Sequence, residues 1–427
     1  MKIHIKNGRL IDPKNGIDAQ RDIYIAAGKI VAVGHAPANF AANRTIDAAG
    51  RVICPGLVDL AVRLREPGYE YMATLESEMD AAIAGGVTSL ACPPDTDPPL
   101  DEPGLVEMLK YRAKNLNLAH VYPVGALTVG LKGARLTEMA ELRDAGCVAF
   151  SQAEAPFADN QVLMHALEYA ATFGFPVWLR PQDPALSHLG VAHDGEVATR
   201  LGLPSIPVTA EVIALSTILI IARATGARVH VARLSSAEGV ALVRDAKAQG
   251  LPVTCDIGIH HAHLSELDIG YFDANCHLKP PLRSRRDRDA LRAGLADGTI
   301  DALCSDHTPV DEDAKQLPFS EAEPGATGVE LLLPLTLKWA AESGLGLAAA
   351  LERITIKPAV LLGIDAGHLS VGSVADICVF DPDCHWRIGA DTLRSQGKNT
   401  PFSGIELRGR VTHTLVGGTL VYEKNSQ

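Results

Sequence analysis

Residues 228–257 read RVHVARLSSAEGVALVRDAKAQGLPVTCDI, and this stretch decides the fold. A run of apolar and β-branched residues at 228–233 is followed by a segment of helical periodicity, and a second apolar run follows at 252–257. A strand, a helix and a second strand within about 30 residues are typical of a βαβ unit, in which the two strands are parallel. The stretch therefore predicts a parallel sheet covered by helices.

The same alternation extends in both directions from this unit, from about residue 53 to about residue 363. The clearest helical patterns lie at 210–225 and 329–341. Six further strands are predicted at 57–63, 87–92, 121–126, 147–151, 176–180 and 301–304. Eight alternations in about 310 residues favour an α/β fold of the (β/α)8 TIM type, with insertions, over an open sheet.

The two ends of the chain have a different pattern. Short β-like runs lie before residue 53 and after residue 364, separated by turn signals such as Asn7-Gly8 and Gly417-Gly418. Each end is too small to fold alone, so we predict that the two ends pair into one small β-sandwich. The predicted domains are thus a β-sandwich formed by residues 1–52 and 365–427 and a barrel formed by residues 53–364.

The composition excludes several classes of function. Of the 427 residues, 47% are hydrophobic, and 39 basic against 51 acidic side chains give a net charge of −12. This charge repels nucleic acids and anionic lipid, and the most apolar stretch, 212–224, is too short to span a bilayer. The eight cysteines are scattered without a CxxC pair, which is typical of thiols in a reducing compartment. We expect a cytoplasmic protein without nucleic-acid or membrane partners.

The motifs at the predicted strand ends resemble those of the dihydroorotases of the amidohydrolase superfamily, over essentially the whole chain. The matching phrases are PGLVD (55–59), LREPG (64–68), GGVTSLACPPDTDPP (85–99), EVATRLGLPSIP (196–207), HLKPPLR (277–283), SDHTP (305–309), EPGATG (323–328) and KNTPFSG (398–404). The resemblance implies a zinc-dependent barrel with a β-sandwich made from both termini. It also implies the reversible closure of carbamoyl aspartate to dihydroorotate in pyrimidine synthesis.

The sequence departs from this family where the family holds its metal. The matching positions are Ala61 and Arg63 for the His-x-His of the first strand, Ala153 for the carboxylate after the fourth, Arg180 and Arg233 for the histidines of the fifth and sixth, and Asp306 after the eighth. Only Asp306 keeps the residue type of the family. Arginine stays protonated and has no lone pair to donate, so we expect no metal cofactor.

The remaining polar residues of the barrel mouth are candidates for binding an anion. Asp306 matches the general acid/base of the family, but we expect it to balance the arginines in a buried charge network, together with Glu66 and Asp183. Arg65 matches a residue that holds the substrate carboxylate, and an ion pair with Glu66 or Asp306 is its alternative role. Further candidates are Asp95 and Lys279, which replace asparagines of the family, and His307, for which a structural role is the alternative.

Three histidines crowd the end of the seventh strand. His260, His261 and His263 could form a replacement metal site with Asp306 or His307. The first two point to opposite faces if the strand continues. The family keeps a His-His pair here without using it for the metal, so we expect structural roles.

Three functions stay open at this point. The first, which we favour, is an inactive homologue, because the resemblance extends to bacterial homologues that act as non-catalytic subunits of aspartate carbamoyltransferase. The second is an active dihydroorotase or other cyclic amidase that uses Asp306 and Arg65 at an atypical site. The third is an anion-sensing module in which Arg63, Arg180 and Arg233 bind a metabolite. We expect a homo-oligomer in each case.

Overall fold

Eight parallel strands form the centre of the computed structural model, which describes residues 1–424. They are β8 (Leu57–Asp59), β9 (Val87–Cys92), β10 (His120–Ala126), β11 (Ala149–Ser151), β12 (Val177–Leu179), β15 (Val229–Val231), β16 (Val253–Gly258) and β17 (Ala302–Cys304). Neighbours pair in chain order from β8 to β17. A parallel bridge between Val62 and His307, just beyond the ends of β8 and β17, brings the first and last strands together. The predicted TIM-type barrel is confirmed.

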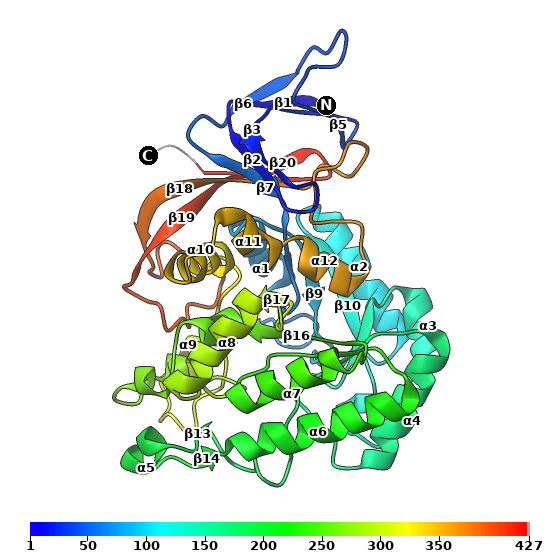
Figure 1. Cartoon of the computed structure of the whole chain (residues 1–427), viewed down its shortest axis with the longest axis vertical. Helices are drawn as coiled ribbons and strands as arrows, with labels where there is room; N and C mark the ends of the chain where they lie inside the picture. Colours follow the sequence, from blue (N-terminus) through cyan, green and yellow to red (C-terminus); the bar gives the residue numbers. More distant parts are fainter. Residues whose placement is uncertain (425–427) are drawn as a thin grey trace.

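Helices cover the outside of the barrel, and shorter ones lie in the loops that follow its strands (Figure 1). They are α1 (Leu75–Ala84), α2 (Pro103–Leu116), α3 (Met139–Ala145), α4 (Asn160–Phe173), α5 (Glu196–Leu201), α6 (Val208–Thr225), α7 (Ala237–Ala248), α8 (Arg285–Asp297), α9 (Glu312–Lys315), α10 (Leu332–Glu342), α11 (Leu347–Glu352) and α12 (Ile356–Leu362). Local sequence sets their ends. Ser236 caps α7 by accepting a hydrogen bond from the Gly239 amide, and α6 ends at Gly226, whose φ of 72° favours glycine.

Two mainly antiparallel sheets lie at one end of the barrel (Figure 1). One contains β1 (Lys2–Lys6), β4 (Ile23–Ala26), β5 (Lys29–Val33) and β6 (Arg44–Asp47), and the other contains β2 (Arg9–Asp12), β3 (Ile17–Gln20), β7 (Val52–Pro55), β18 (Ile377–Arg387), β19 (Glu406–Val416) and β20 (Thr419–Glu423). In the second sheet β18 from the C-terminal part pairs with β7 from the N-terminal part. Strand β7 runs to Pro55, so the second sheet extends past residue 52.

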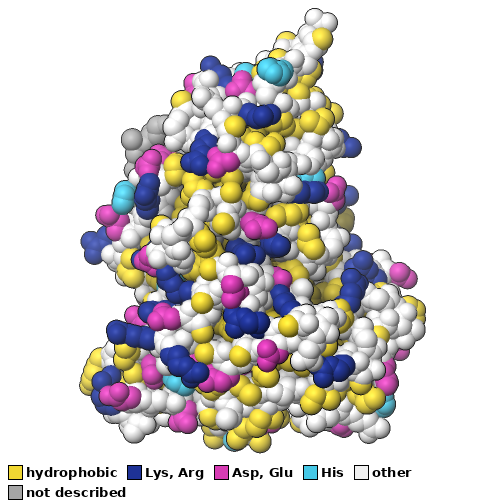
Figure 2. Space-filling model, viewed as in Figure 1, with side chains coloured by type: hydrophobic (Ala, Val, Ile, Leu, Met, Phe, Trp, Pro, Cys, Tyr) yellow, Lys and Arg dark blue, Asp and Glu magenta, His cyan; other side chains and the backbone are white. Residues whose placement is uncertain are grey.

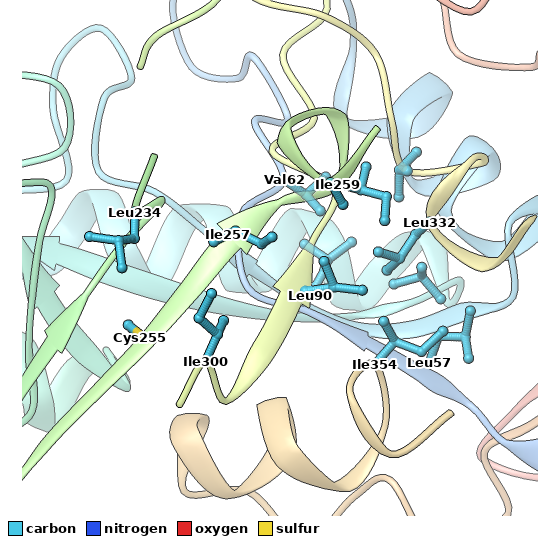
Figure 3. Packing of buried hydrophobic residues seen from close by; sticks show 14 of the residues in the cluster. Leu57, Val62, Leu90, Leu234, Cys255, Ile257, Ile259, Ile300, Leu332 and Ile354 are labelled. Carbon is cyan, nitrogen blue, oxygen red and sulfur yellow. The ribbon is translucent and has the colours of Figure 1, made fainter. Parts of the chain in front are cut away.

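Buried aliphatic side chains fill the space between the barrel strands and the covering helices. Figure 3 shows Leu90, Ile257 and Leu332 in this cluster, and all three are fully buried. Gly56 precedes β8, and a Cβ atom there would lie 2.1 Å from the Thr88 Oγ1 atom. Glycine is therefore required for β8 to approach β9 this closely. The rigid barrel fixes the positions of the residues that follow its strands.

Helix α6 is longer than the sequence pattern indicated. It contains 18 residues with a mean hydropathy of 1.7, and it is the one described helix that could cross a membrane by length and composition. It lies on the outside of the barrel between α4 and α7 (Figure 1). A barrel helix with one apolar face meets the same criterion, so the feature is weak evidence for a membrane.

Candidate functional site at the barrel mouth

Three arginines converge at the C-terminal ends of the barrel strands. Arg63 follows β8, Arg180 follows β12 and Arg233 follows β15, and their side chains are only 4–7% exposed. Because the strands are parallel, residues that follow them share one end of the barrel. The barrel thus brings together three guanidinium groups whose residues are spread along the chain from position 63 to position 233.

Three carboxylates neutralise these arginines. Glu154 contacts all three: its Oε1 lies 2.8 Å from Arg63 Nη2 and also contacts Arg233 Nη1, and its Oε2 lies 2.7 Å from Arg180 Nε. The Asp306 Oδ1 atom lies 3.1 Å from both Arg63 Nη1 and Arg233 Nη1. Asp95 lies 2.8 Å from Arg63 Nε. We call Arg63, Arg180, Arg233, Asp95, Glu154 and Asp306 the mouth network; its formal charges cancel.

The pKa values of Glu154 and Asp306 shift in opposite directions within the mouth network. Burial disfavours the charged form of Glu154, but the guanidinium groups of Arg180, Arg233 and Arg63 outweigh burial and hold its pKa well below its usual range. At Asp306 burial outweighs the attraction of Arg233 and Arg63, so its pKa is raised. Glu154 is therefore the network's firmly ionised group.

The backbone around the mouth network is strained. Four non-glycine residues there have positive φ: Arg65 (61°), Ala153 (51°), Arg233 (56°) and Asp306 (46°). Such conformations cost about 1 kcal/mol or more each and concentrate at functional sites. Three of the four, Ala153, Arg233 and Asp306, stand at positions where the resemblance predicts a metal centre.

A cavity of about 330 Å³ opens above the mouth network. Its polar lining consists of Arg63, Arg65, Tyr69, Asp95, Glu154, Arg233, Lys279, Asp306, Thr308 and Glu323. The Arg65 Nε atom donates to the Pro309 carbonyl at 2.8 Å, and its Nη2 atom lies 3.9 Å from Glu323 Oε1. Of the predicted anion-binding residues, Arg65, Asp95 and Lys279 therefore reach one cavity.

Three predicted interactions of the mouth are wrong. Glu66 pairs with Arg112 and accepts from the Leu75 amide at 2.8 Å, so it contacts neither Arg65 nor the mouth network. Asp183 accepts from the amides of its own loop. Arg65 pairs with neither Glu66 nor Asp306. Asp183 is satisfied within its own loop, whereas Glu66 pairs with a residue of α2 and Arg65 with residues that follow β17.

Glu154 is the residue that sequence reasoning missed. It lies one residue after Ala153, where the resemblance places a carboxylate of the metal centre. The positive φ of Ala153 turns the loop so that the next side chain enters the mouth. An acidic residue beside the position where the resemblance places a metal ligand, together with three arginines at the other ligand positions, was the available signal.

His307 lies outside the cavity. Its Nε2 atom is 2.5 Å from Glu78 Oε2, and its Nδ1 atom accepts from the Gly328 amide at 3.1 Å. Nε2 therefore carries the proton and donates to Glu78. Glu78 also accepts from the Ser395 hydroxyl at 2.6 Å, so His307 connects the eighth strand end to α1 and the C-terminal segment. His307 therefore lies where a structural role, the alternative to anion binding, places it.

The three histidines that follow β16 each contact a backbone carbonyl. The Nε2 atoms of His260, His261 and His263 lie 3.4, 3.1 and 2.9 Å from the carbonyls of Thr327, Pro280 and Leu335. Burial lowers their pKa values to about 3, 4 and 4. We call these three and His307 the histidine layer. Its first three members are neutral at pH 7.

The residues of the mouth do not fit the zinc centre that the resemblance implies. A catalytic zinc needs about three ligands that donate lone pairs, whereas the Arg63 guanidinium group has only N–H groups, which donate hydrogen bonds to the carboxylates of Asp306 and Glu154. Within residues 1–424 no group of three histidine, cysteine, aspartate or glutamate side chains could hold a metal ion. Ala61 and Ala153 contribute only methyl groups.

Comparisons with known proteins agree with the motifs. The family model for dihydro-orotase-like proteins matches residues 50–239. A dihydroorotase-like protein from Pseudomonas aeruginosa is 47% identical over 99% of this chain and 100% of its own length. A dihydroorotase from Geobacter sp. strain M21 is 41% identical over 99% of this chain and 100% of its own length. The structure of an L-hydantoinase from Arthrobacter aurescens superposes with a TM-score of 0.89 at 28% identity, covering 99% and 96% of the two chains.

Proposed function

The chain belongs to the dihydroorotase-like family of amidohydrolases, and from this premise we propose that it is a non-catalytic member that serves as a structural subunit of aspartate carbamoyltransferase. One observation carries the loss of catalysis: Glu154 joins Arg63, Arg180 and Arg233 where the family holds its metal. The three guanidinium groups donate no lone pair to a metal, and they occupy the Glu154 carboxylate with ion pairs.

The intact scaffold supports an assembly role. The eight barrel strands, the mixed sheet of both termini and the strained strand ends are all retained. A chain without any role would lose tight packing positions such as Gly56 as readily as metal ligands. The proposal places the chain in the cytoplasm, as several copies in a complex with the carbamoyltransferase chain.

The test is reconstitution of the complex from the purified chains. Native mass spectrometry of this chain mixed with the aspartate carbamoyltransferase of the same cell is expected to show a complex of fixed stoichiometry. Carbamoyltransferase activity at low enzyme concentration is expected to be higher in the complex than without this chain, because a subunit that binds the assembled form shifts the equilibrium toward it. Separate migration of the two chains, with unchanged activity, would contradict the proposal.

A second candidate is an active cyclic amidohydrolase, and Asp306 is the observation that favours it. Asp306 lines the cavity at the position of the family's general acid/base, and the similarity to an L-hydantoinase extends over the whole chain. Proton transfer by one aspartate contributes about 10²–10⁴-fold, which is a small part of what hydrolysis of a cyclic amide needs. Two ion pairs also hold Asp306 in place. We therefore favour the non-catalytic role.

A further inference from the structure

Glu154 differs from the other carboxylates of the mouth network in its position. It is the one that contacts all three arginines, and its side chain is 28% exposed, against 21% for Asp95 and 11% for Asp306. It projects from the loop between β11 and α4, whereas Asp306 directly follows β17. Glu154 is thus the carboxylate most exposed to solvent, and it lies on a loop that can move without moving a strand.

Withdrawal of Glu154 would leave a defined cationic site. Arg63 would keep Asp95 and Asp306, and Arg233 would keep Asp306. Within the described residues, Arg180 has no carboxylate partner besides Glu154. A buried guanidinium group without a partner is costly, so this position demands a carboxylate from some source.

The space around the Glu154 loop can receive such a ligand. The 330 Å³ cavity of the mouth includes Glu154, Arg63 and Arg233 in its wall. A second cavity of about 310 Å³ includes Ala153 and Arg180. Neighbouring residues of one loop therefore line both cavities, so the arginines can be approached from either side of Glu154.

We propose that the Glu154 carboxylate is an internal ligand that a small external carboxylate displaces, binding Arg63, Arg180 and Arg233 in its place. The inference rests on the proposed function, because only a mouth without a metal leaves these arginines to bind an anion. Guanidinium groups match a planar carboxylate through paired N–H donors, and both Glu154 oxygens already lie against guanidinium groups, Oε1 against Arg63 and Oε2 against Arg180. Binding would release the loop that follows β11 and so report a carboxylate metabolite on the surface of the subunit.

The experiment is thermal unfolding of the full chain and of Glu154→Ala in sodium acetate and in sodium chloride of equal ionic strength at pH 7. In chloride the variant is expected to melt below the unsubstituted protein, and in acetate it is expected to regain several degrees, because acetate fills the vacated position. The unsubstituted protein is expected to respond at least about tenfold more weakly to acetate concentration, because Glu154 competes for the site. Equal melting temperatures of Glu154→Ala in the two salts would overturn the proposal.

Two further variants keep the test decisive. If Glu154→Ala does not fold, calorimetric titration of Glu154→Gln with acetate replaces it, and binding no tighter than to the unsubstituted protein would overturn the proposal. Glu211→Gln is the matched control, because the buried Glu211 carboxylate accepts from Ser235 and Ser236 and forms no ion pair among residues 1–424. No recovery specific to acetate is expected there, and such recovery would mean that acetate acts on the protein in general. Zinc-dependent turnover would contradict the proposed function itself, whereas absence of acetate rescue contradicts only this inference.

Discussion

The mouth network and the histidine layer lie at the same end of the barrel and are similarly buried. They differ in how the unfavourable burial of a charge is avoided or compensated. His260, His261 and His263 lose their charge, with pKa values near 3, 4 and 4, and each contacts one backbone carbonyl. The arginines of the mouth network cannot lose theirs, so they require three carboxylates.

This difference shows how a protein must compensate when arginine replaces histidine at a ligand position. A buried histidine that binds no metal can remain neutral, whereas a buried arginine stays charged and needs an anion beside it. Glu154 supplies that anion here from a loop, one residue away from Ala153, where the resemblance places a metal ligand. On the face shown in Figure 2, basic and acidic side chains alternate without a large patch of one sign, so the concentrated charge of the mouth is a local feature.

The largest expected effect is the acid sensitivity of the histidine layer. Unfolded histidine has a pKa of about 6.5, so between about pH 4 and 6.5 the unfolded state binds more protons and the free energy of unfolding falls on acidification. His260, His261 and His263 together predict a loss of about 5.5 kcal/mol from pH 7 to pH 5. Urea unfolding across this range measures it, and His263→Gln should reduce the slope by about 1.4 kcal/mol per pH unit.

The mouth network should respond in a lower pH window. The folded pKa of Glu154 is depressed, so its stabilisation is complete above about pH 4.5 and is lost as the pH falls below that value. A free energy of unfolding that stays constant from pH 7 to pH 5 would contradict the neutral histidine layer.

Glu78→Ala has the next largest expected effect. The Glu78 carboxylate is fully buried and accepts from His307, Ser395 and the Gln396 amide. Its removal leaves these donors unpaired and should lower the free energy of unfolding by about 3–5 kcal/mol in urea titrations. The exposed Glu76 on the same helix is the control, since Glu76→Ala should cost less than about 0.5 kcal/mol. Equal losses in the two variants would show that the buried hydrogen bonds of Glu78 do not stabilise the fold.

Asp306→Asn should cost less than Glu78→Ala. The amide keeps one acceptor oxygen for Arg63 and Arg233, and the raised pKa of Asp306 means that its charge is already disfavoured by burial. A loss of about 1–3 kcal/mol is expected in the same titrations. Asp183→Asn, which removes only contacts within its own loop, should cost less than about 1 kcal/mol. A larger loss for Asp183→Asn than for Asp306→Asn would mean that Asp183, and not Asp306, neutralises the arginines.

The smallest expected effect is that of Lys279→Ala. Lys279 lies in the wall of the mouth cavity but is exposed and pairs with no carboxylate of the described chain. Its removal should change the free energy of unfolding by less than about 0.5 kcal/mol. A loss above about 1 kcal/mol would mean that the mouth network extends to the rim of the cavity.

The barrel was predictable from sequence because its signals are local. Predicted strands such as 87–92 and 121–126 match β9 (Val87–Cys92) and β10 (His120–Ala126) closely, since periodicity acts over a few residues. Helix α6 begins at Val208, two residues before the predicted start at 210, because the ends of an element carry less periodic signal than its centre.

The arginines of the mouth were also predictable from their places after the strands, but their partners were not. Glu154 meets Arg63 and Arg233 across 91 and 79 residues of chain, and the turn at Ala153 decides that contact. Glu66 and Asp183 lie closer in sequence to Arg65 and Arg180, yet they bind Arg112 and a local loop. Loop conformation sets these pairings, and the sequence carries little information about it.

The most direct test of the central claim is the turnover of dihydroorotate and of carbamoyl aspartate by the full chain after reconstitution with zinc. Metal analysis of the same sample accompanies the assay. A mouth closed by arginine and carboxylate pairs predicts less than one bound zinc per chain and no turnover above the uncatalysed rate at high protein concentration. Turnover that is lost in Asp306→Asn would contradict the account and identify the chain as an enzyme with an atypical site.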